Sequence, residues 1–334
     1  MDKERITQIK NHPIFICGHP KSGTTLVQGI FDSHPQLIVF PEESYFFRNF
    51  LPASTGAGFD EKTMLAEHLL IHMFKWNQDS PPISQNGFPD RDYSEIHFPH
   101  VKKAMYNYLH EKSNSTEADF LSSAVLAFGK VSGQLSEDSK YWVEKTPYNE
   151  LYTKKMFSFW PQAKCIHIIR DPRDNYLSYR RKHPEWSPEF FSENWIRFAK
   201  LGLANQRKLG TDRYLIIRYE DLVTEPEKTI NSMIDFLSIE FHKSLLKPTR
   251  AGKTWLGNSM FDDKYQEISD DPVGRWCDRL STLDANIIMV KSEKVMKQFN
   301  YDCTYSLDIT TKMRLVTWPV RKRLEFLVRK LFRG

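Results

Sequence analysis

Short apolar runs alternate with longer amphipathic stretches along most of the chain. The apolar runs predict buried strands at 14–17, 37–40, 141–144 and 164–169. Apolar positions that recur every three or four residues predict one helix that begins at 24 and others at 61–76, 99–111, 118–135, 150–160, 172–181 and 226–237. Strand–helix–strand alternation is typical of a parallel sheet, so the pattern predicts an α/β fold with a central, mostly parallel sheet flanked by helices.

Two polar stretches interrupt this alternation. Residues 48–60 contain Pro and Gly and predict a loop, and residues 79–92 are rich in Pro and polar side chains, which indicates a surface insertion. With the helices around them they form a block at about 48–138 that separates two strand–helix units. Substrate specificity often resides on insertions over a rigid scaffold, so we predict that this block forms a substrate-binding and lid region.

Composition narrows the class of protein. The chain has 334 residues, of which 27% are charged and 40% hydrophobic, as in soluble globular proteins with a large core. Its first twelve residues are polar and charged, and no run of eighteen apolar residues occurs, so we expect neither a secretory signal nor a membrane-spanning helix. Four scattered cysteines without a C-x-x-C pair favour a reduced, cytoplasmic protein.

The positive charge is concentrated at the C-terminus. Residues 310–334 carry a net charge of +7 while the whole chain carries +5, which leaves −2 for the rest and argues against a nucleic-acid partner. The segment 304–334 is predicted as a basic amphipathic tail whose apolar positions have helical spacing, with Pro319 in the first helical turn, namely Val320, Leu324, Leu327, Val328 and Leu331. Two interpretations stay open: peripheral contact with an anionic membrane, or packing on the body with the basic side in water.

A strand, a short loop and a helix at residues 14–25 predict an anion site. Such an arrangement aims backbone N–H groups and the positive end of a helix dipole at one point, although an ordinary turn between strand and helix is the alternative. Gly18 and Gly23 have the spacing of a nucleoside triphosphate loop, but Thr24 occupies the position of its Lys, and Lys21 lies earlier. An anion site without a requirement for magnesium is therefore predicted.

The carboxyl ends of other strands carry charged residues. Glu42 and Glu43 follow the second strand and Lys145 ends the third, at the edge where open parallel sheets bind ligands. Taken alone, the two carboxylates could form a solvated acidic turn and the Lys could lie on the surface.

Arg170 ends the strand at 164–169, and Ser178 lies two turns into the next helix. A guanidinium beside a hydroxyl is suited to clamp a phosphate. A structural ion pair between Arg170 and Asp171 is the alternative.

These motifs resemble those of sulfotransferases that use 3′-phosphoadenosine 5′-phosphosulfate (PAPS). Pro20–Thr25 resembles the family's 5′-phosphosulfate loop, and Arg170 with Ser178 resembles its 3′-phosphate motif, with Lys145 between them in sequence. The stretch 214–223 resembles the strand that carries a Tyr near the adenine, here Tyr219.

The C-terminal part of the resemblance is closer to the bacterial-type and tyrosylprotein-type members than to the cytosolic small-molecule members. Residues 273–276 and 298–302 are similar to the closing motifs of those members, so that the resemblance covers about 12–302. It implies a P-loop-like three-layer fold and a single sulfotransferase domain at 1–303, with residues 48–138 as its helical acceptor and lid insertion.

The resemblance also implies residue roles. Lys21 would serve the leaving bridging oxygen, and Lys145 the transferring sulfuryl group. The donor would be held by the backbone and hydroxyl groups of the loop and by the 3′-phosphate and adenine contacts, namely Lys21, Ser22, Gly23, Thr24, Thr25, Arg170, Ser178, Tyr219 and Arg275.

The acceptor also needs a base. Pro147 stands where cytosolic members have a His, so the tyrosylprotein pattern implies a Glu, and it favours Glu43 while leaving Glu42 open.

The implied reaction is in-line transfer of a sulfuryl group from PAPS to a hydroxyl, with no metal. The acceptor class stays open among carbohydrate, lipid, peptidyl Tyr and small alcohol, and so does the oligomeric state. A P-loop kinase of small molecules or nucleosides is the alternative enzyme, although no convincing magnesium carboxylate follows a strand. A non-catalytic protein that retained the nucleotide pocket is the third hypothesis.

Overall fold

A five-stranded parallel sheet forms the centre of the molecule. The computed structural model describes residues 2–76, 79–83, 91–110, 115–261 and 263–331, with the side chains of 110 and 325–331 outside the description. In the strand order β2-β3-β1-β4-β5, every neighbouring pair is parallel. The five strands are β1 (Pro13–Cys17), β2 (Leu37–Val39), β3 (Tyr141–Lys145), β4 (Lys164–Ile169) and β5 (Tyr214–Arg218).

Helices make up most of the remaining described chain. They are α1 (Lys3–Lys10), α2 (Thr24–Phe31), α3 (Leu51–Ala53), α4 (Phe59–Leu69), α5 (Phe98–His110), α6 (Glu117–Ser132), α7 (Thr153–Phe159), α8 (Pro172–Arg180), α9 (Pro188–Leu209), α10 (Tyr219–Thr224), α11 (Pro226–Leu237), α12 (Trp276–Arg279), α13 (Thr282–Gln298) and α14 (Ile309–Leu331). A two-stranded antiparallel hairpin follows α11 and consists of β6 (Thr249–Arg250) and β7 (Lys253–Thr254). Among the described residues, no helix is both long and apolar enough to cross a membrane.

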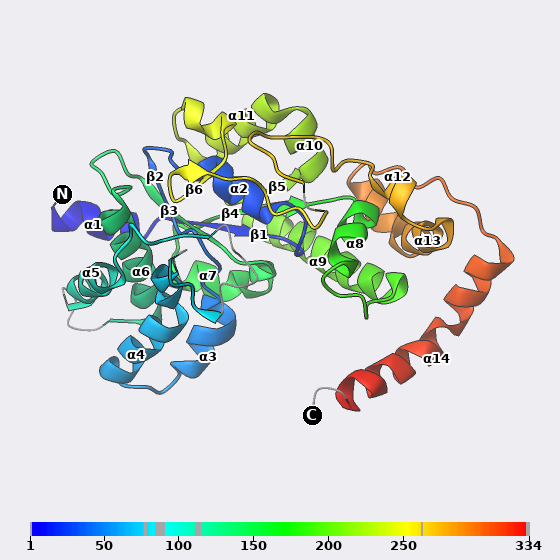
Figure 1. The fold of residues 1–334 in the computed structure, drawn as a ribbon, viewed down its shortest axis with the longest axis horizontal. Coiled ribbons are helices and arrows are strands. Elements are labelled where there is room, and N and C mark those ends of the chain that lie inside the picture. Colours follow the sequence, from blue (N-terminus) through cyan, green and yellow to red (C-terminus); the bar gives the residue numbers. More distant parts are fainter. Residues whose placement is uncertain (1, 77–78, 84–90, 111–114, 262, 332–334) are drawn as a thin grey trace.

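The sheet is buried on both faces because its side chains alternate between two helical layers. In β1, Ile14 and Ile16 join the apolar cluster formed with α2, α10 and α11, whereas Phe15 and Cys17 join the cluster formed with α1, α6 and α7. All four side chains are fully buried. Figure 1 shows these layers on either side of the sheet. The predicted α/β class with three layers is confirmed.

A third apolar cluster lies beyond the sheet, where α8, α9 and α13 pack together (Figure 1). Trp195 of α9 is a buried member of this cluster, and its indole N–H donates to the backbone carbonyl of Arg170 at 3.0 Å. The cluster thereby fixes the point where β4 ends and α8 begins.

The structure differs from the sequence prediction at three places. The predicted loop at 48–60 contains a π-helical turn at Phe46–Phe50 and the short α3, because aromatic side chains of this stretch pack into the core. Tyr219 begins α10 rather than lying in a strand. Residues 77–78 and 84–90, near or within the predicted insertion at 79–92, lie outside the described residues.

The C-terminal helix begins earlier than the sequence pattern predicted. The expectation that Pro319 occupies its first turn is wrong, because α14 begins at Ile309 and Pro319 lies inside it. The side chain of Asp308 accepts a hydrogen bond from the N–H of Thr311 at 2.6 Å and caps this earlier start.

Candidate functional site

The strand ends bring the predicted functional residues together. Ile16 of β1 is paired with Lys145 of β3, Cys17 of β1 with His167 of β4, and Ile169 of β4 with Arg218 of β5. The residues that follow these strands therefore share one edge of the sheet. Lys145, the loop after β1, Arg170 and Tyr219 converge there although they lie far apart in the sequence.

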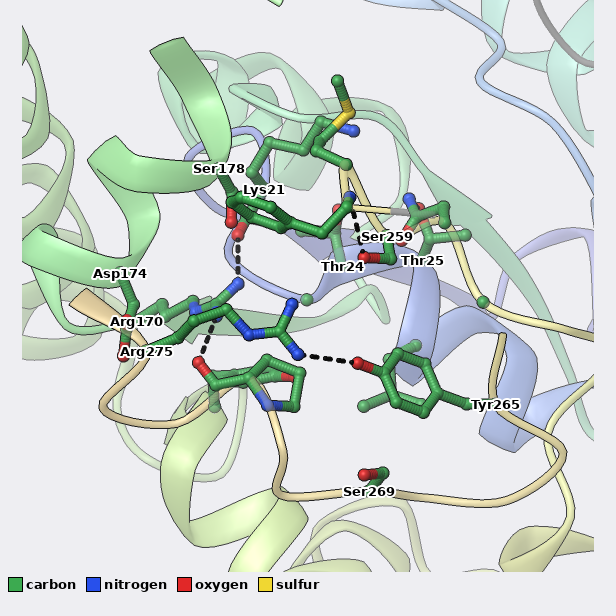
Figure 2. A pocket seen from close by; sticks show the side chains of 18 of the residues that line it. Lys21, Thr24, Thr25, Arg170, Asp174, Ser178, Ser259, Tyr265, Ser269 and Arg275 are labelled. Carbon is green, nitrogen blue, oxygen red and sulfur yellow. Dashed lines mark hydrogen bonds between the residues drawn. The ribbon is translucent and has the colours of Figure 1, made fainter. Parts of the chain in front are cut away.

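A cavity of about 890 Å³, including its open mouth, lies at this edge. Of the nine residues predicted to bind the donor, eight line the cavity: Lys21, Gly23, Thr24, Thr25, Arg170, Ser178, Tyr219 and Arg275. Figure 2 labels all of these except Gly23 and Tyr219. The ninth, Ser22, is buried in the loop, and its hydroxyl donates to the carbonyl oxygen of His19 at 2.6 Å.

Two glycines allow the loop after β1 to lie against its neighbours. Gly18 has a φ of 140°, and a Cβ atom there would be 2.3 Å from the backbone oxygen of Ile168. Gly23 has a φ of 104°, and a Cβ atom there would be 2.5 Å from the ring of Tyr219. A larger residue at either position would clash with β4 or with the tyrosine, so the shape of the loop depends on both glycines.

Three backbone N–H groups at the start of α2 are available for an anion. The Ser22 N–H is engaged by the carbonyl oxygen of His19 at 3.1 Å. No protein acceptor within the described chain meets the N–H groups of Gly23, Thr24 and Thr25. They point toward the cavity side of the helix N-terminus, where the helix dipole favours negative charge. These three N–H groups, and not that of Ser22, are therefore the backbone donors available to an anion at this point of the described chain.

Lys21 supplies a cation whose charge depends on its surroundings. The pKa of Lys21 is lowered to about 8, chiefly by burial and also by the nearby cations Lys182 and Lys145, while Glu43 acts in the opposite direction. A bound anion would restore the pKa of this ammonium group toward its ordinary value. Lys21 is thus suited to respond to negative charge in the cavity.

Arg170 is the second cation of the cavity, and it is 7% exposed. Its guanidinium donates to the backbone oxygens of Lys21 at 3.2 Å and Pro272 at 2.9 Å and lies 4.4 Å from the ring centre of Tyr219. Its Nε is buried and has no hydrogen-bond partner. A buried donor without an acceptor is unusual and is expected where a ligand supplies the acceptor.

The alternative of a structural ion pair between Arg170 and Asp171 does not occur. Asp171 instead pairs with Arg173 at 2.6 Å and caps the start of α8. Arg170 therefore remains directed toward the cavity, as Figure 2 shows.

Described residues of the segment 255–275 line another part of the cavity, and most of this segment was not predicted from the sequence. Arg275 pairs with Asp263 at 2.5 Å and donates to the hydroxyl of Tyr265 at 3.1 Å. Asp174 of α8 accepts from the N–H groups of Gly274 at 2.7 Å and Trp276 at 2.8 Å, which ties the segment to the body. Its irregular backbone has no hydrophobic period, so only the motif at 273–276 pointed to it.

Glu43 and Lys145 form an ion pair next to the cavity. The Lys145 Nζ lies 2.8 Å from Glu43 Oε1, and the Tyr45 hydroxyl donates to the other carboxylate oxygen. Burial alone would raise the pKa of Glu43, but Lys145 and Tyr45 outweigh it and lower the pKa below its ordinary value. Neither partner lines the cavity, but Lys145 is paired with Ile16 near the end of β1, from which the loop with Lys21 follows. Both partners influence the pKa of Lys21.

Glu42, the other candidate base, is already engaged. Its carboxylate pairs with Arg91 at 2.6 Å and accepts from the hydroxyl of Tyr93 at 2.5 Å, and the residue is 4% exposed. Both partners follow the insertion predicted at 79–92 or lie at its end. Glu42 thus connects this block to β2, whereas Glu43 is directed to Lys145.

Glu144 holds the Glu43 loop against β3, and sequence reasoning missed it. Its fully buried carboxylate accepts from the Ser44 hydroxyl at 2.7 Å, from the Ser44 N–H at 3.2 Å, from the Thr146 hydroxyl at 2.5 Å and from the Asn149 amide at 2.8 Å. These bonds fix the residues on either side of the ion pair between Glu43 and Lys145. A Glu inside an apolar strand was the available signal, because a buried carboxylate needs partners.

Comparison with known proteins shows the family of the chain. Residues 13–243 match the family model described as the sulfotransferase family. The chain is 26% identical over 261 residues to an omega-hydroxy-beta-dihydromenaquinone-9 sulfotransferase, Stf3, of Mycobacterium bovis, which covers 70% of this chain and 64% of that protein. It is 22% identical over 239 residues to a protein-tyrosine sulfotransferase of Drosophila melanogaster, covering 70% of this chain and 39% of that protein. The chain therefore matches less than two thirds of the length of these relatives.

Solved structures show the same fold. The sulfotransferase domain of the Synechococcus PCC 7002 olefin synthase superposes with a TM-score of 0.56 at 20% identity, covering 88% of this chain and 96% of that domain. The sulfotransferase domain from the curacin biosynthetic pathway superposes with a TM-score of 0.51 at 18% identity, covering 87% of this chain and 98% of that domain.

Proposed function

The chain belongs to the sulfotransferase family, and from this premise we propose that it transfers a sulfuryl group from PAPS to a hydroxyl of an acceptor. One observation carries the proposal: a single cavity brings together two separate sets of anion-binding groups. Lys21 and the N–H groups at the start of α2 form one set, and Arg170 with Ser178 forms the other. A nucleotide with phosphates on its 3′ and 5′ positions presents two such anions.

The donor would be held at both of its phosphates. The N–H groups of Gly23, Thr24 and Thr25 would bind the 5′-phosphate, with the hydroxyls of both threonines beside them. The buried Nε of Arg170 would donate to the 3′-phosphate, and the Ser178 hydroxyl would complete that contact.

Arg275 and Tyr219 complete the donor site. Arg275 would contribute its charge from the closing segment. The Tyr219 ring, which packs between Gly23 and Arg170, would lie near the adenine.

The residues near Lys21 would carry out the transfer. The bond between sulfur and the bridging phosphate oxygen breaks while a bond forms between sulfur and the acceptor oxygen. Lys21 would stabilise the charge that develops on the bridging oxygen, and Lys145 the charge on the sulfuryl oxygens. Glu43 would take the proton of the acceptor hydroxyl. Fixed cations aimed at the developing charge would therefore provide most of the catalytic effect, with no metal required.

The ion pair between Glu43 and Lys145 must open for this step. A carboxylate whose pKa is lowered stays ionised at neutral pH but is a weak base toward an alcohol. Proton transfer would therefore accompany bond formation to sulfur rather than precede it. When Lys145 turns toward the sulfuryl group, the carboxylate becomes free to accept from the hydroxyl.

The acceptor would approach from the block at 48–138. Arg91, from the middle of this block, pairs with Glu42, the neighbour of Glu43 in sequence. The names of the two relatives refer to an omega-hydroxylated dihydromenaquinone and to protein tyrosine, which both carry a hydroxyl group. A hydroxyl acceptor and the cytoplasmic location favoured by the cysteine pattern are part of this proposal.

Label transfer tests the proposed reaction. Purified protein incubated with ³⁵S-labelled PAPS and a panel of hydroxyl compounds, including hydroxylated menaquinones, carbohydrates, tyrosine peptides and small alcohols, should yield a labelled product in the presence of a metal chelator. Lys21→Ala should abolish it. Transfer from γ-³²P-labelled ATP with magnesium, without transfer from PAPS, would assign the chain to the kinases instead.

A further inference from the structure

The helix α14 presents an apolar stripe to the solvent. Five of its side chains are each more than half exposed, and their spacing of three or four residues puts them on one face: Ile309 77%, Met313 64%, Val316 78%, Val320 67% and Leu324 58%. We call this face the α14 stripe. Single exposed apolar residues are common on surfaces, but a continuous stripe over four helical turns indicates a site of contact with another protein or a membrane.

The opposite side of α14 is fixed to α9 by charges. Arg314 donates to both carboxylate oxygens of Glu189, at 2.9 and 3.0 Å, and Arg321 donates to the same carboxylate at 3.1 Å. Glu189 is fully buried. These ion pairs therefore largely determine which side of α14 faces the rest of the protein.

A second carboxylate continues this attachment one turn further along α9. The Trp318 indole and the Lys322 ammonium both donate to Glu193, at 2.5 and 2.6 Å. Trp318 is 4% exposed. One of the two interpretations of the sequence had the tail packed on the body by its apolar side, with its basic side in water. Over residues 309–324 the structure shows the opposite: several basic side chains face the body, and the apolar stripe faces the solvent. The predicted positions Leu327, Val328 and Leu331 lie outside the described side chains.

The charges beside the stripe indicate what covers it. Residues 309–324 contain five basic residues and no Asp or Glu. Lys312 and Arg323 are exposed next to the stripe. Contact between the stripes of two copies would bring these like charges together with no acidic side chain among residues 309–324 to pair with them, which is unfavourable. An anionic surface would instead be attracted to them.

We propose that α14 lies flat on an anionic lipid bilayer, with the α14 stripe inserted among the headgroups and Lys312 and Arg323 beside the lipid phosphates. A helix with an apolar face and flanking basic residues binds membranes in this way. The proposed binding of α14 to a bilayer does not depend on the proposed transfer reaction.

Vesicle flotation tests the proposal with the full chain. Vesicles of phosphatidylglycerol and phosphatidylcholine in equal parts should carry the wild-type protein, whereas pure phosphatidylcholine vesicles should carry much less. The double variant Val316→Gln/Val320→Gln should lower the partition coefficient on anionic vesicles roughly tenfold or more. A matched variant, Met64→Gln/Phe241→Gln, removes two apolar side chains of similar exposure elsewhere, 57% and 54%, and should bind like wild type.

A charge variant separates the electrostatic contribution from the apolar one. Lys312→Glu/Arg323→Glu should also bind anionic vesicles roughly tenfold more weakly, and added salt should weaken wild-type binding. Wild-type protein that does not float, or a Val316/Val320 variant that floats like wild type, would overturn the proposal. Sedimentation that shows a dimer of the wild type and a monomer of that variant would overturn it in favour of a second copy.

Discussion

The behaviour of the site depends on how individual side chains are paired. Glu42 and Glu43 are neighbours in sequence, yet one is held by Arg91 and Tyr93 while the other faces Lys145. The sequence could indicate that an acidic pair belongs at this strand end, but not which carboxylate is available. That distinction arises from tertiary partners that lie about 50 and 100 positions further along the chain.

Replacement of the proposed base tests its assignment. Glu43→Gln keeps the shape of the side chain but cannot take a proton, so we expect turnover to fall roughly 10²-fold or more. Affinity for the product nucleotide 3′-phosphoadenosine 5′-phosphate (PAP) should persist. Product formation from PAPS measures the first quantity, and calorimetry measures the second. If Glu42→Gln lowered turnover more than Glu43→Gln, the base would be reassigned.

The lowered pKa of Lys21 predicts a pH dependence of nucleotide binding. Burial lowers this pKa to about 8, so Lys21 of the ligand-free protein is charged below pH 8 and neutral above it. A bound anion raises the pKa, so PAP affinity should be highest below pH 8 and fall above it by at most about tenfold per pH unit. Calorimetry between pH 7 and 10 would measure this.

The variant Lys21→Arg provides the control because a guanidinium stays charged over this range. Its PAP affinity should change little with pH. A wild-type affinity that is equally flat would contradict the role of Lys21.

At the scale of elements, the parallel strands could be predicted well and the long helices only in part. Short apolar runs bounded by turn residues indicated β1 to β4 almost to the residue, because both faces of these strands are buried. The sequence analysis did not predict α9 and α13, although they build the third cluster that supports Arg170. Glu144 was missed because its role comes from four hydrogen bonds that no local pattern records.

The loop after β1 gives a test at this scale. Gly23→Ala would push a methyl group into the Tyr219 ring, which also contacts Arg170, so PAP affinity should fall roughly tenfold or more. Gly133→Ala is the matched control: Gly133 also has a positive φ, 77°, but a Cβ atom there would meet no atom within 4 Å. It should lower the free energy of unfolding by about 1 kcal/mol and leave PAP binding unchanged. Equal PAP affinity of both variants would argue against the close packing of this loop.

At the scale of the whole molecule, the sheet edge, the closing segment 255–275 and α14 come from different parts of the chain. The motif at 273–276 indicated that the C-terminal part belongs to the site, but the irregular segment before it has no period from which its path could be predicted. The amphipathic tail could be predicted as a helix, whereas its orientation could not. Orientation depends on Glu189 and Glu193, which lie more than 100 residues earlier in the chain.

The attachment of α14 predicts an effect on stability. Arg314→Gln removes the two-pronged contact with the buried Glu189 and leaves it only Arg321, so the free energy of unfolding should fall by about 1–3 kcal/mol. Lys312→Gln, an exposed change on the same helix, should alter it by less than about 0.5 kcal/mol. Denaturant unfolding at neutral pH compares the two. Equal stabilities would show that α14 is not held by Glu189.

The central claim is that one cavity binds a nucleotide at both its 3′- and 5′-phosphates, and calorimetric titration with PAP tests it most directly. We predict that PAP binds without metal and more tightly than ATP with magnesium. Adenosine 5′-phosphate should bind more weakly, because it lacks the phosphate assigned to Arg170. Arg170→Ala should weaken PAP binding roughly 10- to 100-fold and leave adenosine 5′-phosphate binding almost unchanged. Preference for ATP with magnesium, or PAP affinity that survives in Arg170→Ala, would contradict the assignment of this cavity to the sulfuryl donor.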